Sequence, residues 1–182
     1  FWCSILFNYK WCCLMVVVGL DLSTTSTGFS VYQDGELINH GRFRSDKKNA
    51  FDRIDEIYHM VGDLFKVYDI DVVFVEDVPL SSAMNKRICE LLLLLQGTIY
   101  SHCINNDCAF YQMEPSEWRR IAGVKPEKPR REFQKKAAIE LVNELHGLNF
   151  SWVDDKYDKT TGDSDEAEGI LIGLAGTKLL NK

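Results

Sequence analysis

Long hydrophobic segments are absent from this sequence of 182 residues: no apolar run approaches the ~20 residues that a helix needs to cross a bilayer. The six cysteines form no C-x-x-C pair, and no group of cysteines and histidines has the spacing of a zinc site. Internal repeats and low-complexity linkers are lacking as well. These absences argue against a membrane-spanning chain, a zinc-binding module and a repeat architecture.

Three of the cysteines lie within the first thirteen residues, and the other three (Cys89, Cys103 and Cys108) lie in or near a predicted helix. Such scattered cysteines are typical of buried, reduced thiols in a cytosolic protein. We therefore expect reduced thiols and a cytoplasmic location.

The chain does have enough apolar residues for a folded domain. Hydrophobic residues make up 46% of it and aromatic residues 12%, which excludes a disordered chain. The length suits one domain with a sizeable core. The net charge of −6 and the pI near 5.2 argue against a uniformly basic nucleic-acid binder, although binding depends on local charge rather than on the total.

The first fourteen residues differ from the rest of the chain. They are apolar without strand or helix periodicity, and they lack the basic segment and the small-residue cleavage site of a signal peptide. Met15 directly precedes the first convincing strand. We expect residues 1–14 to be an N-terminal extension and residues 15–182 to form the functional domain.

Periodicity along the functional domain predicts the element order βββαβαβααα. The predicted strands cover residues 15–22, 28–33, 36–43, 71–76 and 108–113, and Asp34-Gly35 marks a hairpin turn between the second and third. The predicted helices cover residues 47–68, 81–103 and 131–145, with a short helix from Pro115 and a last one from Asp163. This order predicts an α/β fold with one mixed sheet and helices on its faces.

Acidic residues stand where these elements end or begin. Asp21 ends the first strand, Glu76 ends the fourth, and Asp165 and Glu168 share one face of the first turn of the last helix. Each acid alone is typical of a solvated turn or of a residue favoured at a helix N-terminus. If the first and fourth strands are neighbours, however, Asp21 and Glu76 converge at one sheet edge, and the last helix can add the other two.

Four carboxylates without a nearby histidine or cysteine are hard oxygen ligands, which suit Mg²⁺ or Mn²⁺ better than zinc. Two such ions about 4 Å apart would activate a water and stabilise the leaving oxygen in phosphodiester hydrolysis. Asp77 and Asp163 are further acids, and either could replace one of the four. The pattern favours a metal-dependent phosphodiesterase.

Three segments resemble the RuvC-type Holliday junction resolvases, members of the ribonuclease H-like nuclease superfamily. VVVGLDLSTTSTGFSVYQDG resembles their opening hairpin, VVFVEDVP their second acidic strand, and SDEAEGILIGLAG their closing helix with its acid-x-x-acid pair. The resemblance extends from about Val16 to Leu180. It implies a ribonuclease H-like mixed sheet of five strands, three antiparallel and then parallel, flanked by helices. It also implies a crossover junction endodeoxyribonuclease, a hydrolase that resolves Holliday junctions and other branched DNA.

By motif position, the resemblance assigns the family's metal ligands and catalytic residues to Asp21, Glu76, Asp165 and Glu168. It implies two Mg²⁺ ions per site, with Mn²⁺ as a substitute. Glu168 departs from the aspartate that is usual in cellular members, and Pro79, followed by Leu80, replaces the aromatic residue with which bacterial members often open the junction. These departures are more similar to the phage-encoded branch. We therefore expect a phage-type enzyme of DNA recombination and repair, located in the cytoplasm of a bacterial host.

Basic residues concentrate in one segment. Residues 119–136 contain eight of them against two acidic residues, a net charge of +6, whereas the rest of the chain carries −12. Such asymmetry is typical of a phosphate-binding segment, although solvated connectors have a similar composition. The resemblance implies that basic residues between the last strand and the last helix approach the scissile phosphate. The candidates for DNA binding in this segment are Arg119, Lys125, Lys128, Arg130, Arg131 and Lys135.

Two hydroxyl residues and one aromatic residue have more than one interpretation. Ser23 and Thr24, beside Asp21, could donate to a phosphate or form a turn, and we include both among the DNA-binding candidates. Trp118 fits a core or hinge position better than a base-stacking platform.

The leucine-rich helix is apolar on nearly all sides. Such a helix is either wholly internal, or it packs on the sheet with one face and pairs through its other face with the same helix of a second copy. A resolvase cuts two symmetric strands, and the family pairs its subunits through this helix. We therefore expect a homodimer through the helix around Ile88–Ile99.

Two other functions compete with the resolvase. GLDLSTTSTG also resembles the first phosphate loop of sugar kinases and Hsp70-like ATPases, but a second Asp-x-Gly loop is missing and the chain is short for a two-lobed fold. The other alternative is an inactive relative that only binds nucleic acid. The four intact carboxylates argue against it.

Overall fold

The structure, a computed structural model, describes residues 15–78, 85–152 and 163–181. The predicted extension over residues 1–14 and the departures at Pro79 and Leu80 lie outside these ranges. The described elements, in chain order, are β1 (Val16–Asp21), β2 (Ser26–Gln33), β3 (Glu36–Arg44), α1 (Ala50–Val67), β4 (Val72–Glu76), α2 (Lys86–Asn105), β5 (Ala109–Met113), α3 (Pro115–Ala122), α4 (Arg131–His146) and α5 (Asp163–Leu180). The predicted element order is confirmed.

Capping residues determine where two helices begin. The Asn49 side chain accepts a hydrogen bond from the Phe51 backbone N–H, so α1 begins at Ala50, three residues after the predicted start. The Asn85 side chain does the same for the Arg87 N–H, and α2 begins at Lys86. The predicted start of this helix at residue 81 lies outside the described residues. The predicted start of α1 was early because helical periodicity does not mark the cap.

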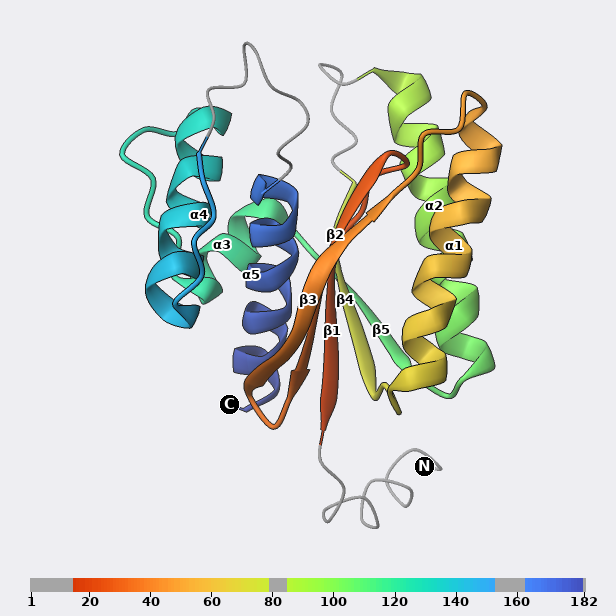
Figure 1. Cartoon of the computed structure of the whole chain (residues 1–182), viewed down its shortest axis with the longest axis horizontal. Helices are drawn as coiled ribbons and strands as arrows, with labels where there is room; N and C mark the ends of the chain where they lie inside the picture. Colours follow the sequence, from red (N-terminus) through yellow and green to blue (C-terminus); the bar gives the residue numbers. More distant parts are fainter. Residues whose placement is uncertain (1–14, 79–84, 153–162, 182) are drawn as a thin grey trace.

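The five strands form one mixed sheet in the order β3-β2-β1-β4-β5 (Figure 1). β1, β2 and β3 pair antiparallel, and β4 and β5 continue the sheet parallel to β1. This arrangement confirms the predicted ribonuclease H-like sheet. The predicted convergence of Asp21 and Glu76 required β1 and β4 to be neighbours, and the strand order confirms that they are.

Helices cover both faces of the sheet. Figure 1 shows α1 and α2 on one side and α3, α4 and α5 on the other. Along β1, Val16, Val18 and Leu20 pack in the core beneath α1 and α2, whereas Val17 packs in the opposite core with residues of α3, α4 and α5. β1 is therefore buried on both faces, as its continuous apolar run predicts.

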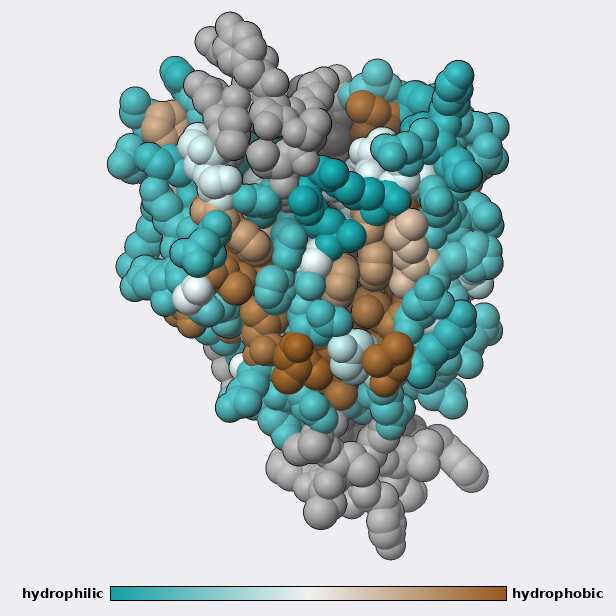
Figure 2. Space-filling view, viewed as in Figure 1, coloured by the Kyte–Doolittle hydropathy of each residue, from teal (hydrophilic) through white to brown (hydrophobic). Residues whose placement is uncertain are grey.

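One edge of the sheet gathers the ends of many elements. β1 and β4 end at the upper edge in Figure 1, where α1, α2, α4 and α5 begin. In the same view, Figure 2 shows mostly hydrophilic residues near this edge, while hydrophobic residues gather lower down, between the two helical layers. Polar chemistry is therefore concentrated at the carboxyl ends of the parallel strands, where α/β sheets bind their ligands.

The leucine-rich helix α2 is only partly covered. Leu95, Ile99 and Cys103 are fully buried, but Leu93 is 43% exposed, and Tyr100 and Ile104 are at least half exposed. The alternative of a wholly internal helix is therefore wrong. The free cysteines Cys89, Cys103 and Cys108 are buried as expected. None of the helices in the described ranges has the length and apolar content required to cross a membrane.

α5 approaches the sheet so closely that only glycine fits at the contact. A Cβ on Gly19 of β1 would collide with the backbone of Gly173 and would lie 2.6 Å from the Gly169 carbonyl oxygen. A Cβ on Gly28 of β2 would collide with the Asp165 carbonyl group. Backbone-to-backbone packing of α5 on β1 and β2 therefore determines where the first turn of α5 lies.

This contact predicts a large cost for Gly19→Ala. The added methyl group meets backbone atoms that cannot move separately from α5, so we expect a loss of about 3 kcal/mol in the free energy of unfolding, measured by urea denaturation. The control is Glu144→Ala at an exposed position of α4. There we expect a change within ~0.5 kcal/mol. Equal stabilities of the two variants would contradict the proposed packing constraint.

Candidate functional site

Asp21 and Glu76 lie at the ends of neighbouring parallel strands. The register of β1 and β4 pairs Leu20 with Val75, the residues directly before the two acids. Carboxyl ends of parallel strands meet at one edge of a sheet, so the two carboxylates share a neighbourhood despite 54 intervening positions. The predicted convergence of these acids follows from this register.

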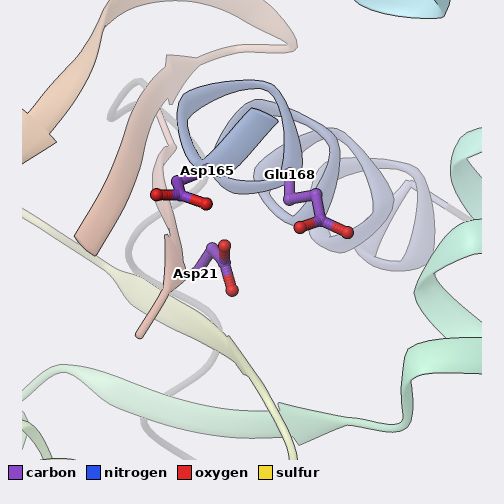
Figure 3. A group of neighbouring side chains, drawn as sticks. All are labelled: Asp21, Asp165 and Glu168. Carbon is purple, nitrogen blue, oxygen red and sulfur yellow. The ribbon is translucent and has the colours of Figure 1, made fainter. Parts of the chain in front are cut away.

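α5 adds two more acids to the same place. Figure 3 shows Asp165 and Glu168 on adjacent parts of α5, with Asp21 close to both. One carboxylate oxygen from each of the three lies within 4.8 Å of the others. Glu168 is only 7% exposed. These residues, here called the carboxylate triad, form the centre of the candidate site.

Glu76 stands beside the carboxylate triad rather than within it. Its Oε2 accepts a hydrogen bond of 2.6 Å from the Trp118 Nε1–H, and its backbone carbonyl accepts one of 2.8 Å from the Gln96 Nε2. Trp118 and Gln96 are both buried. Glu76 is therefore oriented by two side chains from different helices.

Sequence reasoning missed the roles of these two partners. Trp118 is a core aromatic, as predicted, but it also donates to Glu76. Gln96 follows the five leucines of α2 directly and is the polar residue on the buried face of that helix. A single amide after such an apolar run is the signal that could have identified it, because a buried amide requires hydrogen-bond partners.

Two of the predicted DNA-binding cations contact the acids instead of facing solvent. Lys135, 8% exposed, places its Nζ 3.3 Å from Asp165 Oδ1 and 3.0 Å from Ser164 Oγ. Arg119 places its Nη2 3.2 Å from Glu168 Oε1 and 3.6 Å from Glu76 Oε2. The site thus contains four carboxylates and two cations.

Burial and mutual repulsion dominate the electrostatics of the site. Burial raises the pKa of Asp21 well above its ordinary value, and the charges of Glu168, Glu76 and Asp165 raise it further, while Lys135 lowers it. The pKa of Glu76 is raised as well, mainly by burial, although the Trp118 hydrogen bond lowers it. Crowded carboxylates with raised pKa values require more positive charge than the two side chains supply.

The donor set fits a hard divalent cation. Every member of the carboxylate triad offers oxygen, and the group identified in the described residues includes no histidine or cysteine. Oxygen ligands of this kind suit Mg²⁺ or Mn²⁺. The geometry thus agrees with the predicted type of ligand.

The two spare acids do not join the carboxylate triad. Asp163 Oδ2 accepts hydrogen bonds from the backbone N–H and the hydroxyl of Ser151, and so connects the start of α5 to the segment after α4. Asp77 follows Glu76 and is not part of the group of acids that could hold a metal ion among the described residues. Asp163 and Asp77 therefore lie outside the close cluster of Asp21, Asp165 and Glu168.

The first turn of α5 is also anchored from the sheet. Glu166, between the two triad members of α5, accepts a hydrogen bond from His40 Nδ1 and lies 3.6 Å from Arg42 Nε. Both partners belong to β3. This anchor restrains the rotation of α5 and hence the positions of Asp165 and Glu168.

The remaining predicted DNA-binding residues lie in the turn after β1 and in the segment that leads from α3 into α4. Ser23 forms a turn after β1: its hydroxyl accepts from the Thr25 N–H, and its backbone carbonyl accepts from the Thr27 hydroxyl. Thr24 Oγ1 accepts from Arg53 Nε at 3.4 Å. Four basic residues of the segment between α3 and α4 and of the start of α4 are exposed, namely Lys125, Lys128, Arg130 and Arg131. The charge of Arg131 lowers the pKa of Glu76, so this cation interacts electrostatically with the site.

A second basic segment was missed by sequence reasoning. Arg53 donates to the backbone carbonyls of Lys47 and Lys48 at 3.1 Å, as well as to Thr24. It therefore joins the segment before α1 to the turn that follows Asp21, and Lys47 and Lys48 are exposed there. The pair Lys47-Lys48 ahead of a helix is the signal in the sequence that could have identified this basic segment. Basic residues before and within α1 are thus connected to the turn that follows Asp21.

Comparisons with known proteins bear on the fold. No family model matches the sequence, and no curated protein matches it. Among solved structures, T. thermophilus RuvC in complex with a Holliday junction substrate matches with a TM-score of 0.69 and 16% identity, and Thermus thermophilus RuvC with 0.65 and 16%. Each match covers 92% of this chain and 96% of the other. The yeast mitochondrial Holliday junction resolvase Ydc2 matches with 0.58 and 14%, over 90% of this chain and 78% of that one.

These matches establish that the chain has the RuvC-like form of the ribonuclease H-like fold over nearly its whole length. The fold class and the structural resemblance expected from the three motifs are confirmed. Identities of 14–16% explain why the sequence comparisons find nothing, since the shared feature is the arrangement of elements.

The repulsion within the site predicts that Asp21→Asn stabilises the metal-free protein. Because the pKa of Asp21 is raised on folding, its contribution to stability is present below the ordinary pKa of 3.8 and is lost as pH rises through the folded value. The Asp21→Asn variant has no carboxyl group at this position to ionise, so it does not lose stability in this way as pH rises. We expect its melting temperature in EDTA to exceed that of the wild type by a few degrees at pH 7, because a buried charge repelled by three neighbouring acids is removed.

The comparison is made by calorimetry between pH 4 and pH 8, and the difference should grow with pH. Asp55→Asn, on the exposed face of α1, is the control and should change little. A variant no more stable than the wild type at pH 7 would contradict the repulsion.

Proposed function

We propose that the chain is a metal-dependent, structure-selective endodeoxyribonuclease that resolves Holliday junctions and other branched DNA. The observation that supports this function most directly is the carboxylate triad with Glu76 beside it, at the strand ends of a RuvC-like fold. Two of the matched structures carry related functions in their names: RuvC in complex with a Holliday junction substrate, and a mitochondrial Holliday junction resolvase.

Asp21, Asp165 and Glu168 would hold a divalent ion, and Glu76 with Glu168 would hold a second. Bound Mg²⁺ would supply a hydroxide nucleophile near neutral pH and neutralise charge on the leaving oxygen. The protein's own part is positional. Trp118 and Gln96 orient Glu76, Lys135 orients Asp165, and the backbone contacts of α5 keep the acids together.

Phosphate binding would fall to the basic residues around the site. Arg131 and its exposed neighbours lie at and before the start of α4, and the exposed Lys47 and Lys48 lie before α1, where Arg53 joins their backbone to Thr24 of the turn after Asp21. Thr24 and Ser23 have a turn-forming role in addition to any contact with phosphate. The ATP-binding alternative has less support, because the residues that converge are carboxylates and cations rather than glycine-rich phosphate loops.

A homodimer through α2 fits a substrate with two symmetric strands. The exposed side chains of Leu93, Tyr100 and Ile104 follow one another at helical spacing, with the open position Gly97 between them. Apolar surface of this extent on a helix indicates a partner. The phage-type origin and the location in a host cytoplasm stay predictions from the sequence.

The function is tested with a synthetic four-way junction. We expect symmetric nicks in opposite strands with Mg²⁺ or Mn²⁺, and none in EDTA. Asp21→Asn should reduce cleavage by at least 10³-fold, because it removes a ligand from the site, while it retains junction binding; Asp55→Asn should cut like the wild type. Full cleavage by Asp21→Asn, or cleavage in EDTA, would rule out the metal mechanism.

Charge reversal tests the phosphate contacts. In the Asp21→Asn background, Arg130→Glu with Arg131→Glu should weaken junction binding and reduce the salt slope by about 2, since each lost phosphate contact removes ~0.9. Lys66→Glu, at the far end of α1, is the control and should leave both quantities unchanged. An unchanged slope in the double variant would remove this segment from the DNA path.

The dimer is tested by light scattering. Each chain has a mass of 20.9 kDa, and we expect the wild type to elute at twice that mass. Leu93→Glu places a charge within the apolar stripe and should yield monomers. Ile38→Glu, at an equally exposed apolar position on β3, should not. A monomeric wild type, or a dimeric Leu93→Glu, would contradict the α2 interface.

A further inference from the structure

Arg119 occupies an unusual position for a DNA-binding residue. Its Nη2 lies between Glu168 Oε1, at 3.2 Å, and Glu76 Oε2, at 3.6 Å. The Arg119 side chain is 19% exposed, and the Glu168 side chain is 10% exposed. A single nitrogen of the guanidinium thus bridges two acids that come from different elements, β4 and α5.

Trp118 holds the guanidinium in this position. The Arg119 Cζ lies 4.5 Å from the centre of the indole ring, within the range of a cation–π contact. The same indole donates its Nε1–H to Glu76 Oε2, the oxygen nearest to Arg119. Trp118 and Arg119, consecutive residues of α3, therefore both contact Glu76 Oε2.

Formal charge limits how many ions the site can take. Lys135 is committed to Asp165 and Ser164, and Arg119 to Glu76 and Glu168. Four carboxylates and two cations carry a formal charge of −2, which one divalent ion at the carboxylate triad balances. A second ion between Glu76 and Glu168 would find Arg119 already there.

We propose that Arg119 is a built-in counter-ion that occupies the position of the second divalent cation and competes with it for Glu76 and Glu168. The inference rests on the proposed metal-dependent function and makes it more specific. Without DNA, the site holds one divalent ion tightly, and the second enters only when the guanidinium moves away.

One N–H donor of Arg119 has no hydrogen-bond partner in this position, which favours movement of the guanidinium away from the acids. The Nε of Arg119 is buried and has no hydrogen-bond partner among the described residues. A buried donor without a partner lowers the stability of the arrangement that contains it. The guanidinium therefore bridges the two acids while one of its donors stays unpaired.

Calorimetric titration of Mg²⁺ into the DNA-free protein tests the proposal. We expect one tight ion and one weak ion per wild-type chain. Arg119→Gln should bind the second ion at least tenfold more tightly. Arg120→Gln removes the same charge from an exposed neighbouring position and is the matched control, with wild-type binding expected.

Arg119→Lys provides a second variant that keeps the charge and hence the fold. Its ammonium group is a compact point charge in place of the planar guanidinium, so the second ion should bind severalfold more tightly than in the wild type. Equal binding of the second ion by the wild type and both Arg119 variants would overturn the proposal. Absence of Mg²⁺ binding in every protein would instead contradict the proposed metal-dependent function, so the two failures are distinguishable.

Discussion

The close packing of α5 on β1 and β2 is the constraint on which the rest of the structure depends. Gly19 and Gly28 on the strands face the α5 backbone, and Gly169 and Gly173 on the helix allow the approach. This contact brings Asp165 and Glu168, which follow Asp21 by more than 140 positions, within reach of it. Side chains larger than hydrogen at the contact would separate the helix from the sheet and so open the carboxylate triad.

Concentrating acids in this way has an energetic cost, and the protein offsets it with cations of its own. Lys135 and Arg119 come from the segment that is most basic in the sequence, but both pair with acids of the site; Lys135 is buried and Arg119 is mostly covered. The basic segment therefore divides into two sets. Lys135 and Arg119 offset the charge of the acids, and Lys125, Lys128, Arg130 and Arg131 are exposed. The charge asymmetry of the chain, +6 against −12, reflects both.

The order of elements and the identity of the acids could be predicted because their signals are local. Alternation and helical periodicity depend on a few neighbouring residues, and an acid at the end of an apolar run is visible in the same window. The helix starts at Ala50 and Lys86 were less predictable, because the caps Asn49 and Asn85 compete with the continuing pattern. The roles of Trp118 and Gln96 could not be predicted, since a hydrogen bond to Glu76 depends on packing between helices and sheet.

The sequence by itself determined the fold class, the four acids and the basic segment, because apolar periodicity and charge are properties of the chain. Only the tertiary structure decided which groups meet. It separated Glu76 from the carboxylate triad, placed Arg119 and Lys135 among the acids, and brought Lys47 and Lys48 to the turn after Asp21. These contacts depend on strand order and on the depth at which α5 packs. Both are set by interactions between residues far apart in the chain, and no local pattern encodes them.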